Sequence, residues 1–313
     1  MVGLTVPQRE TLLVTGAGGF VGAAVARVAL AAGHRVVAMS RTPHPSRLAD
    51  VHGDLVLGAV DMAETPALTA AVAAAKPDCV VHCAWEGVGG AKRAADIQFA
   101  NIATTCTLVD AAVAAGATKF VGIGSQAEYG RFDRRIREDD LPEPTMLYGA
   151  AKLSACHLAR QRSLGTGMEF AWLRLFSTYG PGDNPNWLIP SVITDLVARR
   201  RPRLTAGTQC WDYLHVDDVA RAIVAVATTP AAQGVFNLSS GQAVPVRTVV
   251  EQLRDLVAPE RALGFGEIPF GSDQIMFLEG DNERLRTATG WAPQVTLTKG
   301  LAGTVAAMTR VAA

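Results

Sequence analysis

The feature that most constrains the fold is a regular alternation of apolar runs and alanine-rich runs along residues 1–175. Apolar residues follow one another without polar interruption in runs that begin at Thr11, His34, Leu55, Asp78, Lys119 and Glu169. Such runs are typical of parallel strands buried on both faces of a sheet. The intervening segments 21–33 and 98–116 have helical composition, and Gly116 is expected to end the second helix. The alternation predicts βαβ units and an α/β, doubly wound parallel Rossmann sheet.

The rhythm changes after Phe176, where STYGPGDNPNW has the composition of a loop. A helix over 190–200, the strand-like WDYLHV and a helix capped by Asp217 or Asp218 are expected next. We therefore expect a smaller, discontinuous C-terminal substrate lobe. The prediction assigns 1–175 and 209–240 to the dinucleotide-binding Rossmann domain, and 176–208 and 241–313 to the substrate-binding lobe.

Composition narrows the class of protein. The 313 residues are 49% hydrophobic and 19% charged, which argues for a large core and against disorder. The formal net charge of +0 gives no attraction to nucleic acid or to an anionic membrane, so neither is an expected partner. Five cysteines without a disulfide framework or metal-ligand spacing predict reduced thiols, a cytoplasmic location and no metal site. The longest uncharged apolar stretch, 11–26, is shorter than the ~18 residues that a membrane span needs.

A glycine-rich turn follows the first predicted strand. TLLVTGAGGFVG places Gly16, Gly19 and Gly22 in a G-x-x-G-x-x-G run that opens a helix, with Phe20 and Val21 between the last two glycines. Glycine permits the tight turn and lets backbone amides approach a pyrophosphate at the helix N-terminus. Because the strand and the helix flank the run, it predicts a dinucleotide-binding loop.

The end of the second strand indicates which dinucleotide is bound. An NAD site usually has an acidic residue there for the ribose 2′-hydroxyl, whereas this chain has Ser40 and Arg41. These side chains can bind a 2′-phosphate, so NADPH is favoured over NAD as cofactor, although Arg41 can also be a solvated loop residue. Asp61 and Met62 are expected to flank the adenine, and Asp61 can equally be a helix cap.

Tyr148 and Lys152 form the candidate catalytic pair. They stand at i and i+4, on one face of a predicted helix. A phenol is a weak acid or base at neutral pH, and a neighbouring ammonium and an oxidised nicotinamide both lower its pKa. Lys152 can also hold the cofactor ribose. Ser125, just beyond the fifth strand, can hydrogen-bond the substrate oxygen beside Tyr148.

Motifs in a fixed order connect these residues to a known family. TGAGGFVG, NIATT, GSQAEYG, YGAAK, RLFSTYGPGD, WDYLHVDDVARAI and TGWAPQVTLTKGL span nearly the whole chain. The chain resembles the extended short-chain dehydrogenases/reductases, also called the NAD-dependent epimerase/dehydratase family. The resemblance implies a nucleotide-sugar substrate and a homodimer. It makes Ser125, Tyr148 and Lys152 a catalytic triad and places the following residues at the cofactor: Cys83, Ala84, Trp85, Asn101, Leu175, Phe176 and Ser177.

The same resemblance narrows the chemistry. Dehydratases of the family have an Asp-Glu pair where this chain has Gln126 and Ala127, and decarboxylating members have Glu at the position of Ala127. Glu128 is one position away and would point elsewhere in an extended segment. We therefore expect NADPH-dependent reduction of a 4-keto (6-deoxy) nucleotide-sugar with Tyr148 as general acid, as in ketoreductases resembling CDP-abequose synthase. The alternative is a nucleotide-sugar 4-epimerase with tightly bound NAD.

Two positions weaken the prediction that the substrate carries a nucleotide diphosphate. Arginines that commonly contact the diphosphate in the family are replaced by Trp211 and by the Gly271-Ser272 segment. A reductase or dehydrogenase of a non-nucleotide carbonyl or sugar substrate therefore stays open. The predicted helix over 190–200 ends in an arginine cluster that can compensate or can simply be an exposed basic helix end: Arg199, Arg200, Arg201 and Arg203. The candidate substrate-binding residues, each of which can instead serve packing, are Trp85, Glu86, Gln126, Trp187 and Trp211.

Overall fold

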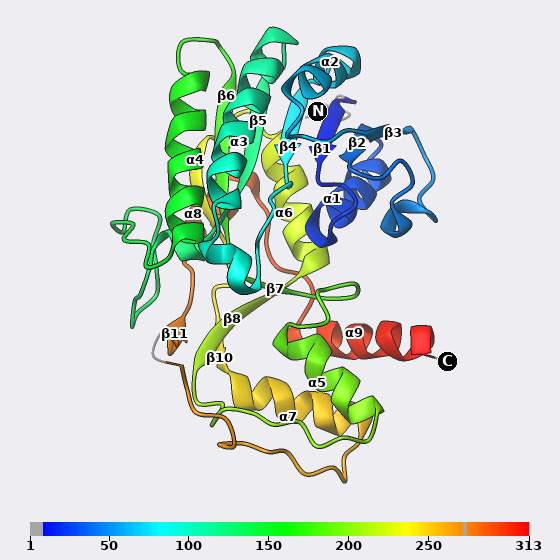
Figure 1. The fold of residues 1–313 in the computed structure, drawn as a ribbon, viewed down its shortest axis with the longest axis vertical. Coiled ribbons are helices and arrows are strands. Elements are labelled where there is room, and N and C mark those ends of the chain that lie inside the picture. The colour runs from blue at the N-terminus through cyan, green and yellow to red at the C-terminus, as the bar shows by residue number, and fades with distance from the viewer. Residues whose placement is uncertain (1–8, 272–273, 313) are drawn as a thin grey trace, which may run out of the picture.

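Strand β1 (Thr11–Thr15) shows how the main sheet is built. Leu12 and Val14 are completely buried in one hydrophobic core, and Leu13 between them is completely buried in another. Because successive side chains of a strand point to opposite faces, both faces of this sheet must be covered. The computed structural model describes residues 9–271 and 274–312, and in it helices cover both faces (Figure 1).

All strands of the main sheet run parallel, in the order β3-β2-β1-β4-β5-β6-β9. The other strands are β2 (Arg35–Ser40), β3 (Leu55–Ala59), β4 (Cys79–His82), β5 (Lys119–Ser125), β6 (Glu169–Leu175) and β9 (Gly234–Leu238). The chain reverses its direction of winding at β1, so that β4 lies beside β1. This is the doubly wound Rossmann arrangement that the alternation predicted, and the fold class is confirmed.

Helices α1 (Phe20–Ala31) and α6 (Val216–Thr228) pack on one face of the sheet. Helices α2 (Thr65–Ala75), α3 (Ile97–Ala114) and α4 (Leu147–Ser163) pack on the other. Helix α3 ends as expected, because Gly116 adopts the left-handed φ of 80° that follows a helix C-terminus. Among the described residues α3 alone is long and apolar enough to span a membrane, but it lies between α2 and α4, as a core helix does.

One strand departs from the expected burial. β3 was predicted to be buried on both faces, yet Val56 is 41% and Leu57 38% exposed. The reason is its position, because β3 is the outermost strand of the sheet and has a neighbouring strand on one side only. A run of apolar residues does not distinguish an edge strand from a central one.

A smaller lobe lies below the carboxyl ends of the strands in Figure 1. Its sheet is centred on β8 (Cys210–His215), which pairs with β7 (Ser177–Tyr179), β10 (Ala243–Pro245) and β11 (Phe277–Leu278). Its core is formed mainly by α5 (Leu188–Val197), α7 (Val246–Val257) and α9 (Leu297–Ala312). Segment 209–240 is shared, since β8 belongs to the small sheet whereas α6 and β9 pack with the large one. The short helix α8 (Glu283–Thr289) adjoins β9.

The start of α6 corrects a sequence prediction. The cap is His215, whose Nδ1 accepts a hydrogen bond from the Asp217 backbone N at 3.3 Å, and neither Asp217 nor Asp218 caps the helix. The buried Asp218 carboxylate instead accepts hydrogen bonds from the backbone N atoms of Gln294 and Val295, both at 2.8 Å. Asp218 thereby ties the C-terminal segment to α6, which no local pattern could indicate.

Candidate active site

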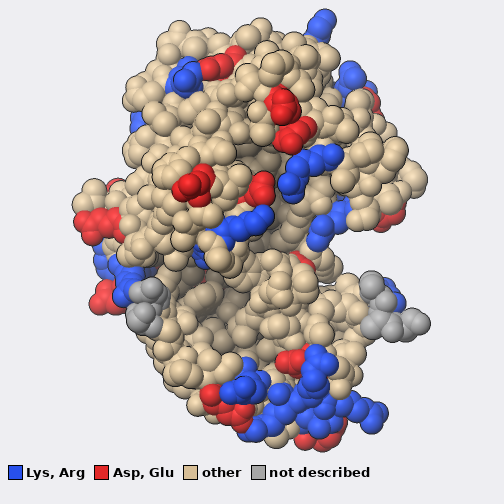
Figure 2. All heavy atoms as spheres, in the orientation of Figure 1, with Lys and Arg blue, Asp and Glu red and all other residues tan. Residues whose placement is uncertain are grey.

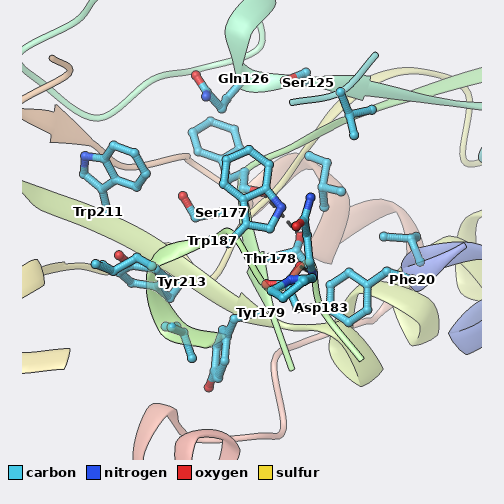
Figure 3. Close-up of a pocket in the computed structure, with 18 of the residues that line it drawn as sticks. Phe20, Ser125, Gln126, Ser177, Thr178, Tyr179, Asp183, Trp187, Trp211 and Tyr213 are labelled. Atoms are coloured by element: carbon cyan, nitrogen blue, oxygen red, sulfur yellow. Dashed lines mark hydrogen bonds between the residues drawn. The ribbon is translucent and has the colours of Figure 1, made fainter. Parts of the chain in front are cut away.

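A cavity of about 870 Å³ lies between the main sheet and the smaller lobe. Figure 2 shows the surface hollowed at this level. Figure 3 shows Ser125 and Gln126 entering the cavity from one side, Trp211 and Tyr213 from another, and Phe20 from the start of α1. The sequence-predicted residues that line the cavity are Gly16, Gly19, Phe20, Val21, Gly22, Cys83, Trp85, Ser125, Gln126, Tyr148, Leu175, Phe176, Ser177, Trp187 and Trp211.

The glycine loop forms a cradle that larger residues would fill. Gly16 has a φ of 67°, and a Cβ there would lie 2.7 Å from the Ala84 backbone N. A Cβ on Gly22 would lie 2.3 Å from the Gly16 carbonyl oxygen. The helix start therefore lies close to the turn after β4, and its N-terminus opens into the cavity without a side-chain cap. This geometry fits the pyrophosphate of a dinucleotide.

Two buried hydroxyls and a histidine fix the turn after β4. The Thr15 hydroxyl lies 2.8 Å from His82 Nδ1, and Thr105 Oγ1 lies 3.1 Å from His82 Nε2. Thr15 Oγ1 also accepts a hydrogen bond from the Ala84 backbone N at 3.3 Å. Burial lowers the pKa of His82 to about 3, so the ring is neutral at physiological pH. Thr15, His82 and Thr105 are structural supports of the cavity floor.

Asn101 supports the same turn from helix α3. Its Oδ1 accepts a hydrogen bond from the Glu86 backbone N at 3.0 Å, and its Nδ2 donates to the Glu86 carbonyl oxygen at 2.8 Å. Asn101 does not line the cavity, and neither does Ala84. Both residues act on the cavity through the backbone of segment 83–86. The exposed Glu86 carboxylate lies at the surface, 3.2 Å from Lys92 and 3.7 Å from Arg41.

Tyr148 lies at the start of α4 and reaches the cavity beside Ser125 at the end of β5. Both are 8% exposed. Burial raises the pKa of the Tyr148 phenol, while a hydrogen bond with the Ser125 side chain and the charge of Arg93 act in the opposite direction. Ser125 Oγ also accepts a hydrogen bond from the Ala127 backbone N at 3.2 Å, which fixes the orientation of the serine. The pair that the sequence placed 23 residues apart is adjacent in space.

Lys152 lies one helical turn behind Tyr148, outside the set of cavity-lining residues. Its Nζ donates to the Ile123 carbonyl oxygen at 2.6 Å and lies 3.7 Å from the centre of the Trp85 ring. Burial lowers the pKa of Lys152 to about 7, partly opposed by the charge of Glu128. Trp85 also meets the Tyr148 ring edge-on, with 6.3 Å between centroids. Trp85 therefore contacts both side chains of the predicted pair.

Glu128, which the sequence left without a role, organises the back of the site. It is completely buried in the 3-10 turn η3 (Gln126–Glu128) that follows β5. Its carboxylate accepts hydrogen bonds from the Ser125 backbone N at 2.9 Å, from Trp172 Nε1 at 3.0 Å and from Arg174 Nε at 2.8 Å. The charge pair with Arg174 is buried on both sides. This network holds Ser125 from behind and points away from the cavity.

The adenosine end of the cradle gathers cationic and polar groups around Gly18. A Cβ on Gly18 would lie 3.4 Å from Ser40 Cβ, so the end of β2 touches the glycine loop. Arg47, which sequence reasoning missed, lines the cavity and donates to the carbonyl oxygens of Gly18 at 3.2 Å and Gly182 at 2.8 Å. Arg47 thus bridges the glycine loop and the loop after β7.

The other residues predicted to contact adenosine lie outside the lining set. Ser40 Oγ donates to the Thr42 carbonyl oxygen, and Arg41 is exposed and lies beside Glu86. Asp61 Oδ1 accepts from the Ala63 backbone N at 3.0 Å, whereas α2 begins at Thr65 without a side-chain cap. The helix-cap alternative for Asp61 is therefore wrong. Met62, next to it, packs partly against the core on the α2 side.

The lobe supplies aromatic and amide groups to the cavity. Trp211 donates through Nε1 to the Ile275 carbonyl oxygen at 3.0 Å, so its ring is held in place, while Trp187 is 41% exposed at the rim. Gly271 is exposed, and Ser272 lies outside the described residues. Four buried polar atoms of the cavity wall have no hydrogen-bond partner among the described residues: Arg93 Nε, Gln126 Oε1, Gln209 Oε1 and the Tyr213 hydroxyl. Arg93, Gln209 and Tyr213 were missed by sequence reasoning.

The arginine cluster after α5 is mostly paired at the surface. Arg200 pairs with Asp195, and Arg201 and Arg203 pair with Glu267. Figure 2 shows basic side chains gathered at the lower end of the molecule, mixed with acidic ones. Arg203 also lines the cavity. Apart from Arg203, the paired arginines do not approach the cavity.

Known proteins resemble the chain over almost its full length. The profile of the NAD dependent epimerase/dehydratase family matches residues 12–239. A dTDP-glucose 4,6-dehydratase of Streptomyces griseus is 31% identical, with 94% of this chain and 93% of the relative covered. A GDP-6-deoxy-D-mannose reductase of Pseudomonas aeruginosa is 30% identical, with 93% and 95% covered.

Solved structures agree with these sequence relatives. MoeE5 in complex with UDP-glucose and NAD has a TM-score of 0.82 and 29% identity, with 97% of this chain and all of that chain covered. The family profile and the shared fold identify the family of this chain. They do not identify its reaction, because the relatives catalyse different reactions. The chain belongs to the NAD-dependent epimerase/dehydratase family, the extended short-chain dehydrogenases/reductases, whose members among these relatives modify nucleotide-sugars.

Proposed function

We propose that the chain is an NADPH-dependent reductase of a 4-keto nucleotide-sugar, with Tyr148 as the general acid. The observation that carries the proposal is the meeting of three features in one cavity: the glycine cradle, the Ser125–Tyr148 pair and a wall with four buried polar atoms that have no partner among the described residues. A ligand with several hydroxyl and carbonyl groups would satisfy such a wall, because an unpaired buried polar atom costs about 1–3 kcal/mol. A nucleotide-sugar has these groups.

The residues of the cavity suit carbonyl reduction. When bound, NADPH would supply a hydride to the carbonyl carbon of the substrate. Because burial raises the pKa of Tyr148, its phenol carries a proton at neutral pH and can donate it to the carbonyl oxygen. Ser125, held through its backbone by Glu128, can hydrogen-bond the same oxygen and orient it. The charge of Arg93 and the Ser125 hydroxyl then stabilise the phenolate that remains.

The segment beside Ser125 favours reduction over elimination. Gln126 and Ala127 have no ionisable side chain, and the carboxylate of Glu128 is fully engaged by Ser125, Trp172 and Arg174. The cavity wall at this point therefore offers no acid and base for the loss of water. Reduction of a ketone needs only the proton of Tyr148 and a hydride.

The preference for NADPH is proposed from the groups near Gly18. Arg47 donates to the Gly18 carbonyl oxygen, Ser40 lies beside Gly18, and Arg41 follows Ser40 at the end of β2, so guanidinium groups are available where the 2′-phosphate of NADPH would lie. Replacing Arg41 by Asp should weaken NADPH binding at least ~10-fold and NADH binding far less, because a phosphate ligand is lost and a repulsive charge is added. Equal losses for both cofactors, or tighter binding of NADH by the unaltered protein, would assign the site to NAD.

The test of the reaction is the consumption of NADPH. Purified protein is mixed with NADPH and 4-keto derivatives of UDP-, dTDP-, CDP- and GDP-sugars, and nicotinamide absorbance is followed together with product analysis. The expected result is one NADPH oxidised for each 4-hydroxy sugar formed. Interconversion of a saturated nucleotide-sugar with its 4-epimer, with no net absorbance change, would establish an epimerase with retained NAD. Turnover of carbonyl substrates without a nucleotide would identify the enzyme as a reductase or dehydrogenase of a non-nucleotide carbonyl or sugar substrate.

A further inference from the structure

Arg93 is a cationic side chain of the cavity wall. It lies in the 3-10 turn η2 (Gly90–Ala94) and lines the cavity, with its guanidinium carbon 4.5 Å from the centre of the Tyr148 ring. Its Nε is buried and unpaired, and no residue within 9–271 and 274–312 forms a hydrogen bond or an ion pair with it. The neighbouring Lys92, by contrast, is exposed and pairs with Glu86 at 3.2 Å.

An arginine in this state lacks an acceptor. A guanidinium keeps its charge at every physiological pH and has five N–H donors. Its stacking on the Tyr148 ring uses only the face of the group and leaves the donors free. Of these donors, Nε is buried and has no hydrogen-bond partner among the described residues, so an anion that enters the cavity gains a charge-assisted hydrogen bond there.

The position of Arg93 limits which anionic group of the cofactor or the substrate can reach it. The phosphates of the dinucleotide belong at the glycine cradle, which already has Arg47 at Gly18. The diphosphate of a nucleotide-sugar leaves the anomeric carbon, which is opposite carbon 4 in a pyranose ring. When carbon 4 is at Tyr148, the diphosphate therefore points away from Arg93. The groups that remain near Arg93 are the substituents on the carbons next to the reacting carbon.

We propose that Arg93 binds a carboxylate carried next to the reacting carbon, so that the preferred substrates are nucleotide-linked acidic sugars, hexuronates in particular. The inference rests on the proposed function and narrows its substrate class, because a 6-deoxy sugar has a methyl group where a hexuronate has the carboxylate. The ion pair has a second consequence. The 4-keto form of a hexuronate is a β-keto acid, and pairing with Arg93 stabilises its ionised carboxylate against loss as neutral carbon dioxide.

The test compares sugar pairs that differ only in this carboxylate. Binding of UDP, dTDP, CDP and GDP is first measured by calorimetry in the presence of oxidised cofactor, and the tightest-binding nucleotide sets the pair, such as UDP-glucuronate and UDP-glucose. In the unaltered protein the hexuronate should bind at least ~10-fold more tightly than the hexose. Arg93→Met should bring the two dissociation constants to within about 3-fold of each other. Arg93→Lys should restore part of the preference.

Lys92→Met is the matched control, because it removes one positive charge from the adjacent exposed position and should keep the preference. The inference is overturned if the unaltered protein binds both sugars equally or favours the hexose, or if Arg93→Met weakens both in the same proportion. In those cases the nucleotide and the hexose still bind, so recognition of nucleotide-sugars stands and only the preference for an acidic sugar is lost. If no nucleotide or nucleotide-sugar binds at all, the proposed function fails and this inference fails with it.

Discussion

The floor and the lobe wall of the cavity are built in opposite ways. On the floor, Thr15 and His82 have protein partners for their polar side-chain atoms, and a Cβ at Gly16 would collide with backbone. On the lobe wall, Gln209 Oε1 and the Tyr213 hydroxyl are buried without partners among the described residues. The floor at Thr15 and His82 is complete without a ligand, whereas the lobe wall at Gln209 and Tyr213 lacks groups that a ligand would supply.

Because of this difference, substitutions on the floor should change the stability of the fold, whereas substitutions on the lobe wall should change ligand binding. Removing a polar group from the floor leaves its former partner unsatisfied and must destabilise the fold. Removing an unpartnered group from the lobe wall takes away a desolvation cost, so its effect should appear in binding alone.

The largest effect is expected at Glu128, behind the floor. Glu128→Ala leaves the buried Arg174 guanidinium without its carboxylate, which should lower the free energy of unfolding by about 3–5 kcal/mol in denaturant titrations. Glu128→Gln should retain more stability because an amide oxygen still accepts from Trp172. Asp110→Ala removes an exposed ion pair with Arg162 and should cost at most ~1 kcal/mol. Equal losses for Glu128→Ala and Asp110→Ala would mean that the buried network does not stabilise the site.

At the catalytic pair, Tyr148→Phe should lower kcat at least ~100-fold while cofactor binding stays nearly unchanged, because only the proton donor is lost. The reaction of the unaltered enzyme should also depend on pH in a defined direction. Reduction needs the neutral phenol, and burial raises the pKa of Tyr148, so kcat should persist into alkaline solution and fall as the pH rises through that pKa. A variant that keeps more than a tenth of kcat would assign the proton to another group.

A substitution of Arg47 tests whether this residue contributes to cofactor binding, to the stability of the glycine loop, or to both. Arg47→Ala should weaken NADPH binding about 10-fold in a fluorescence titration, because a charged donor at the glycine loop is lost. Arg47 also joins the loops at Gly18 and Gly182, so a fall in thermal stability without cofactor would reveal a structural share of its role. Unchanged binding of both NADPH and NADH would remove Arg47 from the site.

The smallest effects are expected for two single-group substitutions, one on the cavity floor and one on the lobe wall, which compare the two regions directly. Thr15→Val removes the acceptor of the Ala84 backbone N and should lower the free energy of unfolding by ~1 kcal/mol. Tyr213→Phe removes a hydroxyl that has no described partner and should leave stability unchanged or slightly higher. Nucleotide-sugar binding should weaken about 5-fold in Tyr213→Phe. A stability loss in Tyr213→Phe as large as that in Thr15→Val would contradict the contrast between floor and lobe wall.

Residues close together in the sequence determined the fold class and the cradle. Gly16 follows β1 and Gly22 lies in the first turn of α1, and the close approach of Gly22 to the Gly16 carbonyl oxygen is set by that local geometry, whereas the approach of Gly16 to Ala84 depends on the fold. The i, i+4 spacing placed Tyr148 and Lys152 on one helix face, since helical periodicity alone decides this. The buried strands were visible as apolar runs, except that an edge strand such as β3 has the same pattern as a central one.

Contacts between distant segments decided the rest. Glu128 is a polar residue in a turn until β6 brings Trp172 and Arg174 beside it, and His215 caps a helix on which two aspartates were better candidates. Arg93 stands next to Lys92 in an ordinary basic run, and only the folded chain places one in the cavity and the other in solvent. The physical reason is that burial and pairing depend on which segments meet, and the sequence around a residue does not contain that information.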